Sequence, residues 1–227
     1  MSNIESSKNP AAAGVRYTVI AILVVVLVIL LGFMNKLSKP RVLNEHELRA
    51  YGAYLLSTPR KVSPFKLTDH RGHPFTDEQL QGKWTMIFFG FTHCPDICPT
   101  TLAVLSKMYQ ELDSDEMADL QVVMVSLDPE RDSLEKLAQY VPYFHQDFLG
   151  VAADKYVLLK LATELNVAYT KAPLTGASVQ ADDYTIDHSG NIILMNPKGH
   201  FHGYLRPPFE HGSMRVAWRS IRETFPD

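Results

Sequence analysis

The feature that most constrains this chain is an uninterrupted apolar run at residues 17–34, YTVIAILVVVLVILLGFM, which contains no charged residue. A helix needs about 20 predominantly apolar residues to cross the roughly 30 Å hydrocarbon core of a bilayer. A cleaved signal peptide would have a shorter apolar region and a small-x-small cleavage site after it, and GFMNKLSKP offers no such site. We therefore predict an uncleaved transmembrane helix that anchors the chain.

The predicted anchor divides the 227-residue chain into unequal parts. We predict a cytoplasmic tail at residues 1–16 and a polar connector at residues 35–60, with a short helical segment in NEHELRAYGAYLL. Residues 61–227 can bury one hydrophobic core, because single domains mostly contain roughly 100 to 200 residues. The expected organisation is one domain tethered to a membrane.

Charge bears on orientation and on partners. Two basic residues precede the span and three follow it: Lys8 and Arg16, then Lys36, Lys39 and Arg41. This count favours a cytoplasmic domain, although large domains translocate regardless of nearby charge. Beyond residue 41 the chain has 17 Lys/Arg against 24 Asp/Glu, a formal net charge of −7. Since no basic stripe is visible, we expect no nucleic-acid partner.

Apolar patterning beyond residue 60 alternates between strands and helices. The runs WTMIFFGFT (residues 84–92) and LQVVMVSLD (residues 120–128) are continuous, as in strands buried on both faces. The other predicted elements are a hairpin at 65–80, a helix opening near Pro99, helices at 133–144 and 154–166 with a strand at 148–153 between them, a hairpin at 191–205 and a helix at 214–225. This order predicts an α/β domain with a central mixed sheet between helices.

The only two cysteines, Cys94 and Cys98, lie in FFGFTHCPDICPTTL, between the first buried strand and the next helix. The residue before a proline avoids the α region, so we expect Cys98 to be the N-cap and Cys94 to lie in the loop before it. Helix N–H groups and the helix dipole stabilise a thiolate there and lower the thiol pKa. The pair can form a redox-active disulfide or a soft half-site for Cu(I) or Zn(II). Flanking prolines argue against a buried structural disulfide.

A copper ion that changes oxidation state needs an imidazole beside the thiolates, because histidine serves both states. Five of the nine histidines lie near polar turns or helix ends and are expected at the surface: His46, His70, His73, His145 and His211. His93 neighbours Cys94, but adjacent side chains of an extended segment point apart. His200 and His202 alternate along a strand and are a possible secondary site. His188 directly precedes a strand expected to pair near the strand that delivers Cys94.

Three segments in this order, GFTHCPDICPTTL, VSLDPERDSLEKLAQYV and DYTIDHSGNIILMNPKGHF, resemble the Sco/SenC family of copper chaperones across roughly residues 60–225. The resemblance implies a thioredoxin-like fold in which Cys94, Cys98 and His188 bind copper, as Cu(I) or Cu(II). For Asp128 and Arg131 of the second segment it leaves two roles open, a partner surface or, more simply, capping of the following helix. The segments at 170–183 and 205–214 depart from the family pattern, which leaves partner recognition open.

The resemblance also implies a function: delivery of copper to the dinuclear copper centre of cytochrome c oxidase. The implied partners are the copper-site subunit of the oxidase, an upstream copper donor and a thiol reductant, since an oxidising periplasm favours the Cys94–Cys98 disulfide. The N-terminal tail lacks the Arg-rich character of a mitochondrial transit peptide, so we predict a bacterial inner membrane with the domain facing the periplasm.

Other functions stay open at this stage. The main alternative to a metallochaperone is a thiol:disulfide oxidoreductase that reduces cysteines of the oxidase or of a redox regulator. A peroxiredoxin-like peroxidase and a membrane-bound copper or redox sensor are more remote.

Overall fold

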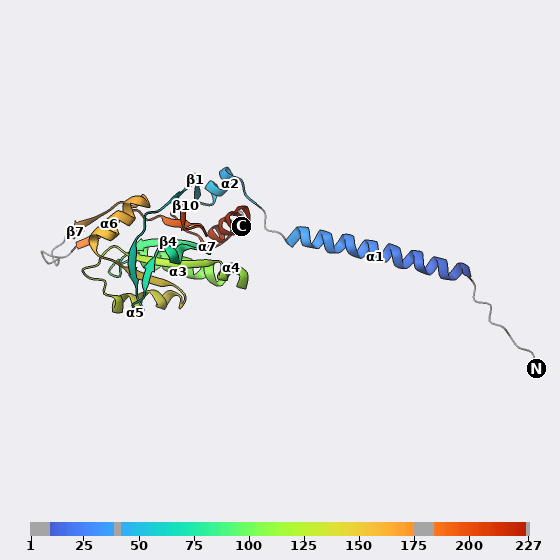
Figure 1. Ribbon diagram of the computed structural model, residues 1–227, viewed down its shortest axis with the longest axis horizontal. Helices are drawn as coiled ribbons and strands as arrows, with labels where there is room; N and C mark the ends of the chain where they lie inside the picture. The colour runs from blue at the N-terminus through green and yellow to red at the C-terminus, as the bar shows by residue number, and fades with distance from the viewer. Residues whose placement is uncertain (1–9, 39–41, 175–183, 226–227) are drawn as a thin grey trace, which may run out of the picture. The chain divides into compact units, whose positions relative to one another are not determined.

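The computed structural model describes residues 10–38, 42–174 and 184–225 (Figure 1). The chain divides into two compact units, Met1–Val42 and Leu43–Asp227. The tail predicted at residues 1–16 lies partly outside the described residues, and the first helix begins within it, at Pro10.

The described part of the first unit is mainly one helix, α1 (Pro10–Ser38). Its 19-residue segment Arg16–Met34 has a mean hydropathy of 3.0, and none of the segment is buried against the protein. In a helix every backbone polar group is bonded within the segment, so a helix of this length and composition is compatible with a bilayer core. The predicted apolar helix is therefore present.

The second unit is built on an eight-stranded sheet with the order β1-β10-β9-β4-β5-β6-β2-β3. Its strands are β1 (Ala53–Lys61), β2 (Lys66–Asp69), β3 (Pro74–Thr76), β4 (Trp84–Gly90), β5 (Leu120–Ser126), β6 (Leu149–Ala152), β9 (Ile192–Met195) and β10 (His200–Leu205). The pairs β4–β5 and β5–β6 are parallel and the others are antiparallel. The predicted central mixed sheet is confirmed.

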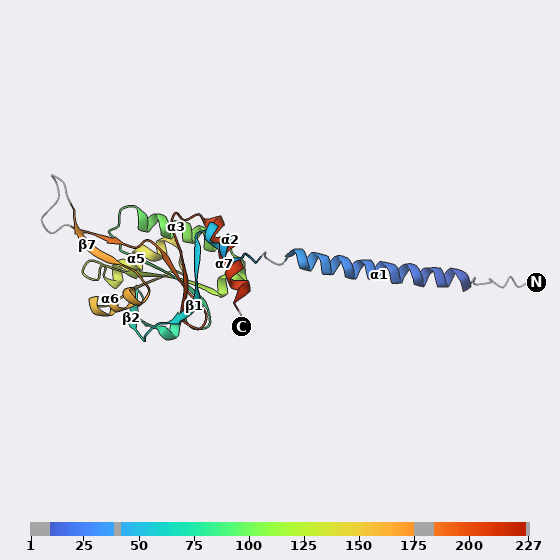
Figure 2. The same ribbon diagram turned by 90° about the horizontal axis from the view of Figure 1, so that it is seen from above.

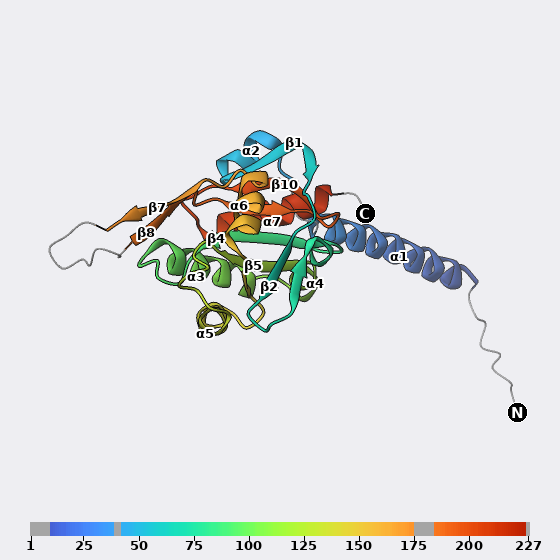
Figure 3. The same ribbon diagram turned by 60° about the vertical axis from the view of Figure 1, so that its left-hand side comes forward.

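Helices cover both faces of this sheet. They are α2 (Glu45–Ala50), the 3₁₀ helix η1 (Asp77–Leu80), α3 (Ile97–Gln110), α4 (Ser114–Ala118), α5 (Leu134–Phe144), α6 (Lys155–Glu164) and α7 (His211–Thr224). Figures 1 and 3 show α6 on one face and α3 and α5 on the other. Trp218 of α7 packs edge-on against Trp84 of β4, with ring centroids 5.7 Å apart.

Strand β4 lies at the centre of the sheet and delivers the chain to the cysteines. All seven of its residues are buried, because β9 and β5 flank it and helices cover both faces. Phe88 lies opposite Met124 of β5 and Ile192 of β9. The register on both sides fixes the point at which the chain leaves the sheet, at Gly90.

A separate two-stranded antiparallel sheet, β7 (Tyr169–Pro173) with β8 (Tyr184–His188), was not predicted. Figure 2 shows this hairpin extending from the body of the second unit. Only Ile186 among its residues is buried, so the hairpin lacks the apolar alternation that identifies a strand from sequence. Residues 175–183, most of the segment at 170–183, lie outside the described residues.

The connector predicted at residues 35–60 differs from the structure. The short helix α2 is present, with Asn44 and Glu47 forming a capping box, but β1 is an edge strand paired with β10. The compact unit therefore begins at Leu43, ahead of residue 61. Only Ala53 is fully buried in β1. An edge strand with so few buried residues has no apolar pattern, so its sequence resembles that of a polar connector.

Candidate metal centre

The cysteine loop joins the end of β4 to the start of α3. Helix α3 begins at Ile97 with Asp96 as N-cap, and the Asp96 side chain makes no capping hydrogen bond. Instead the backbone N–H of Cys98 donates to Cys94 Sγ, at 3.4 Å. The expectation that Cys98 is the N-cap is wrong, because the helix opens ahead of the proline and Cys98 is its second residue. The sulfur of Cys94 occupies the place of a capping oxygen.

Gly90 allows Cys98 to approach the sheet. A Cβ atom at Gly90 would lie 2.8 Å from Phe88 Cε1 and 3.1 Å from Cys98 Sγ. These separations are shorter than van der Waals contact, so only a residue without a side chain fits there. Cys98 is consequently fully buried against the core, whereas Cys94 remains partly exposed.

The two free thiols differ in acidity. The side-chain hydrogen bond from Cys98, followed by the backbone N–H groups of Cys98 and Asp96 and by the charge of His188, lowers the pKa of Cys94 to about 6, against the opposing effect of burial. The pKa of Cys98 is raised, because its thiol donates to Cys94 and because it is buried. At neutral pH the pair therefore favours a thiolate at Cys94 and a thiol at Cys98.

His188 is the last residue of β8 and faces the cysteine loop. Its ring packs edge-on against two aromatic rings, with centroids 6.2 Å from Phe88 and 6.3 Å from Phe91. His188 Nδ1 lies 3.1 Å from the carbonyl oxygen of Ser189, which can only accept a hydrogen bond. Nδ1 is therefore the donor, and in the neutral ring Nε2 offers its lone pair to a metal ion.

Cys94 and His188 line the same pocket, which has a volume of about 650 Å³. The other lining residues are mainly apolar side chains of the cysteine loop, α3 and the segments around β8 and β10, including Phe91, Ile97 and Phe209. The structure thus brings His188 into the region of Cys94 and Cys98, although it lies far from the two cysteines in the sequence. A pocket with apolar walls and few polar donors is a usual form for a small-ligand site.

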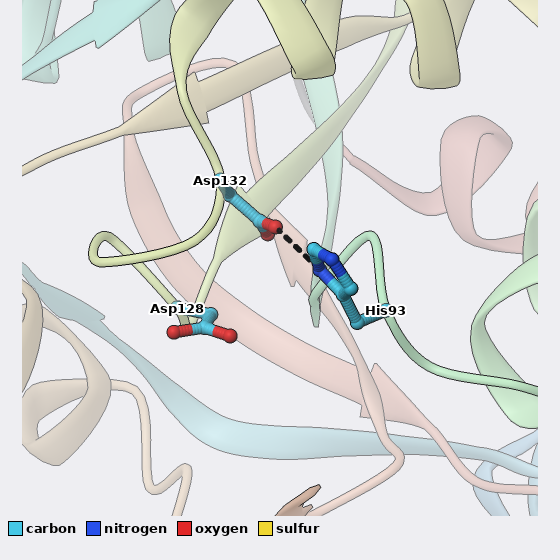
Figure 4. Close-up of side chains that lie close together, drawn as sticks. All are labelled: His93, Asp128 and Asp132. Atoms are coloured by element: carbon cyan, nitrogen blue, oxygen red, sulfur yellow. Dashed lines mark ion pairs between the residues drawn. The ribbon is translucent and has the colours of Figure 1, made fainter. Parts of the chain in front are cut away.

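The two sulfurs and the imidazole nitrogen are nevertheless not gathered to metal-binding distance. Within the described part of the chain, one group of three or more His, Cys, Asp or Glu side chains has its ligand atoms all within 4.8 Å of one another: His93, Asp128 and Asp132 (Figure 4). Cys94, Cys98 and His188 do not form such a group. A metal ion held by all three requires the imidazole and the sulfurs to come closer together, by rotation of the side chains or by movement of the β7–β8 hairpin or the cysteine loop.

The group in Figure 4 is explained by hydrogen bonds. Asp132 accepts from the backbone N–H and the hydroxyl of Thr92 and from the Ser126 hydroxyl, and Asp128 accepts from Arg131 and from the Tyr184 hydroxyl. His93 is exposed, and its Nδ1 lies 3.7 Å from Asp132. Because both carboxylates are fully buried and already bonded, this group serves structure rather than metal binding.

Other histidines have structural surroundings. His202 packs edge-on against Trp84, with ring centroids 5.0 Å apart, and its Nδ1 lies 3.3 Å from Asn196 Nδ2. Neither His200 nor His202 belongs to a group of clustered metal-ligand atoms within the described part of the chain, so nothing here supports the secondary site considered for them. His70 and His145 are only partly exposed, contrary to expectation: His70 Nδ1 accepts from the Gly150 N–H, and the His145 ring packs edge-on against Tyr109. His46 and His73 are exposed as expected.

The structure gives residues 128–132 a role that sequence reasoning missed. The N-cap of α5 is Ser133, whose side chain accepts from the Lys136 N–H, so the capping role expected of Asp128 and Arg131 is wrong. The polar side chains of this segment turn toward the cysteine loop and the β7–β8 hairpin instead. The sequence DPERD directly follows a buried strand, which indicates a loop at the end of a strand. It does not indicate which segments that loop contacts.

The second unit is thus a mixed-sheet domain with two free cysteines at the N-terminus of a helix that follows a central strand, facing a histidine across a pocket. A model of the SCO1/SenC family matches residues 55–222, and the chain belongs to this family. A crystal structure of Arabidopsis thaliana ScoI with copper bound is similar, with 32% identity, a TM-score of 0.64 and coverage of 71% of this chain and 98% of that chain. The fold is the thioredoxin-like fold that the resemblance implied.

Relatives of known sequence point the same way. A proposed copper-binding protein from Stutzerimonas stutzeri is 36% identical over 163 residues, which cover 71% of this chain and 78% of that protein. The mitochondrial protein SCO2 of Saccharomyces cerevisiae is 38% identical over 153 residues, which cover 67% of this chain and 48% of that protein. The chain therefore spans about half the length of the yeast relative that it matches.

Proposed function

We propose that the protein is a membrane-anchored copper chaperone that carries one copper ion on Cys94, Cys98 and His188. The observation that carries the proposal is the shared pocket, which Cys94, with a pKa lowered to about 6, and His188 both line. Thiolate sulfur suits Cu(I), and neutral imidazole serves Cu(I) and Cu(II), so the donor set fits copper as cargo. No turnover is needed, because cargo leaves by ligand exchange.

The proposed recipient is the dinuclear copper centre of cytochrome c oxidase, by analogy with the family. The remaining partners are the copper-site subunit of that oxidase, an upstream copper donor and a thiol reductant. The apolar helix α1 supports a single-pass anchor. We place the protein in a bacterial inner membrane with its second unit in the periplasm, where a cysteine pair needs that reductant to stay able to bind metal.

Copper titration of the full-length chain in detergent tests the proposal. The reduced chain is expected to bind one copper ion and, with Cu(II), to show sulfur-to-copper charge-transfer absorption. Oxidation to the Cys94–Cys98 disulfide removes both thiolates, so binding should disappear and return on reduction. Cys94→Ala should abolish the charge-transfer band. Equal copper uptake by reduced and oxidised chains would refute a thiolate site.

A second function, thiol:disulfide reduction, is favoured by the unequal thiols. A partly exposed thiolate at Cys94 can attack a target disulfide, and the buried thiol of Cys98 can then resolve the mixed disulfide. The target gains two electrons, Cys94 and Cys98 become a disulfide, and an upstream thiol reductant restores the pair.

His188→Ala separates the two functions. A reductase should keep most of its exchange rate with a small disulfide, because the imidazole is neither the nucleophile nor the resolving group. A chaperone should lose copper affinity, because one of three donors is missing. Retained exchange together with unchanged copper binding would favour the reductase and contradict the chaperone.

A further inference from the structure

The segment at residues 128–132, between β5 and α5, contacts both halves of the proposed site. On one side it holds the cysteine loop through Asp132, which is fully buried. Asp132 accepts from the Thr92 backbone N–H at 3.0 Å and from the Thr92 hydroxyl at 2.5 Å. The Ser126 hydroxyl at the end of β5 donates to the same carboxylate, at 2.6 Å. Thr92 is two residues before Cys94, so this bond network fixes the chain just ahead of the nucleophilic sulfur.

On the other side the segment holds the first residue of β8, four residues before His188. The Tyr184 hydroxyl donates to Asp128 Oδ1 at 2.6 Å, and Asp128 is fully buried. Arg131 Nη1 donates to the Tyr184 carbonyl oxygen at 3.0 Å, while Arg131 Nε donates to Asp128. Tyr184 is thus bound through its side chain and its backbone to a single acid–base pair.

Packing reinforces this contact. The Arg131 guanidinium lies over the Tyr184 ring, 3.7 Å from its centroid, and Lys171 of β7 lies over the same ring at 4.3 Å. Lys171 Nζ also pairs with Glu130 at 2.6 Å. Arg131 Nη2 is buried without a hydrogen-bond partner among the described residues. Burial of a guanidinium nitrogen is costly, so the other contacts of Arg131 must offset that cost.

We infer that Asp128, Arg131 and Tyr184 form a clasp that positions His188 relative to the cysteine pair, so that they are positioning residues for the proposed copper site. The β7–β8 hairpin is not part of the main sheet, so the sheet does not fix its orientation. The clasp joins it to a segment whose other end, Asp132, joins the cysteine loop. One five-residue segment therefore sets the distance between the thiolates and the imidazole. The copper-binding measurement below depends on the proposed function, whereas the positioning of His188 by the clasp does not.

The physical effect of the clasp is preorganisation. Without it the hairpin samples more orientations, and copper binding must then order the hairpin as well as close the site, which lowers affinity. A hydrogen bond to a charged group supports roughly a tenfold or larger change in an equilibrium constant. The thiolates should be unaffected, because Asp132 and Thr92 remain in place.

Tyr184→Phe is the sharpest test, because it removes only the hydroxyl that donates to Asp128 and leaves the ring. Tyr156→Phe is the matched control, since Tyr156 on α6 is 73% exposed. Arg131→Lys is the second variant, because lysine keeps the charge but lacks the planar fork whose Nε and Nη1 bond Asp128 and the Tyr184 carbonyl oxygen. All are made in the full-length chain in detergent. The readouts are the His188 imidazole NMR signals without metal, the alkylation rate of Cys94, and Cu(II) affinity with its charge-transfer spectrum.

We expect Tyr184→Phe to shift or broaden the His188 signals and to weaken Cu(II) binding about tenfold, with the Cys94 alkylation rate unchanged. Arg131→Lys should act in the same direction, and Tyr156→Phe should match the wild type. Unchanged His188 signals in both clasp variants would overturn the inference. An equal change in Cys94 alkylation would also overturn it, because it would indicate general loosening.

The two proposals fail in different ways. A wild-type chain that binds no copper would refute the proposed chaperone function, and the His188 signals would still decide whether the clasp positions the imidazole. Copper binding that depends on His188 but is identical in Tyr184→Phe and wild type would refute the clasp and leave the chaperone function standing.

Discussion

The two segments that carry the proposed ligands are held in different ways. The cysteine segment continues from β4, the central strand, and Cys98 is buried against Phe88 and Gly90. The histidine segment ends a two-stranded hairpin with one buried residue, Ile186, and is joined to the domain largely by polar contacts. Apolar packing dominates around Cys98, whereas the His188 ring packs on Phe88 and Phe91 and is oriented, in our proposal, by the polar clasp at the start of β8.

This difference teaches how a site can be both ordered and able to close. A core strand with neighbours on both sides has little freedom, because interiors are close-packed. Polar contacts at a partly exposed hairpin contribute less each and can be exchanged at lower cost. A cargo site needs both properties, since the ion must be held and then released to a recipient.

The largest expected effect concerns which segment controls the acidity of Cys94. The hydrogen bond from the Cys98 thiol is the leading cause of the low pKa of Cys94, and the charge of His188 is the weakest. Cys98→Ala should therefore move the midpoint of Cys94 alkylation far upward from about pH 6. His188→Ala should move that midpoint little. In the wild type the rate should fall as pH drops through 6, because the thiolate is the nucleophile. Alkylation with iodoacetamide followed by mass spectrometry measures this, and Cys98→Ser, which keeps a donor, is the control. A larger shift in His188→Ala than in Cys98→Ala would reverse the comparison.

Truncating the core beneath the cysteines should cost the most stability. Phe88→Ala removes a fully buried ring and should lower the free energy of unfolding by about 3–5 kcal/mol. Tyr143→Ala on α5, where the side chain is 84% exposed, is the control and should stay within about 0.5 kcal/mol of wild type. Urea denaturation followed by circular dichroism measures both. Similar losses of unfolding free energy in the two variants would show that packing around β4 does not hold the cysteine segment rigidly.

A smaller effect is expected from filling the space beside Cys98. Gly90→Ala should cost about 1–3 kcal/mol through overpacking and displace the Cys98 sulfur, so oxidation of the pair should also slow. Gly190→Ala is the matched control near His188, since an added Cβ would meet only Pro207 Cγ at 3.7 Å. Denaturation midpoints and the rate of disulfide formation are the measurements. A neutral Gly90→Ala would show that the cysteine segment yields more readily than its packing indicates.

The smallest effect is expected at the rim of the hairpin. The ion pair between Lys171 and Glu130 is exposed, with side chains 45% and 66% accessible, so Glu130→Gln should cost less than about 1 kcal/mol. Its effect on copper affinity should be well below that of Tyr184→Phe, and it should vanish at high salt. Titrations at low and high ionic strength measure this. A loss of copper affinity equal to that of Tyr184→Phe would show that the exposed Lys171–Glu130 pair positions His188 as much as the buried clasp does.

Sequence reasoning worked best where burial is strong. The runs at 84–92 and 120–128 predicted β4 and β5, because a strand buried on both faces is apolar at nearly every position. It failed where the strands are half-exposed. The sequence of β1 predicts a polar connector, and the sequences of β7 and β8 show no apolar alternation. Such elements are stabilised by pairing with distant partners, which periodicity does not report.

The candidate site divides in the same manner. Cys94 and Cys98 are four residues apart, so local chain geometry already placed them at one helix start. The sequence patterns alone left several histidines as candidates for the third copper ligand, and only the family resemblance selected His188. For Asp128 and Arg131 the sequence favoured helix capping over a partner surface, because a sequence shows the neighbours of Arg131 along the chain and not Tyr184 across the fold.

By itself, then, the order of residues determined an apolar helix, an α/β domain and a pair of thiols beside a helix N-terminus, since each depends on interactions within one short stretch of chain. The tertiary structure alone decided that the thiols differ in burial, that His188 faces them across a pocket, and that residues 128–132 connect the two. These depend on contacts between segments dozens of residues apart, which a pattern along the chain does not report.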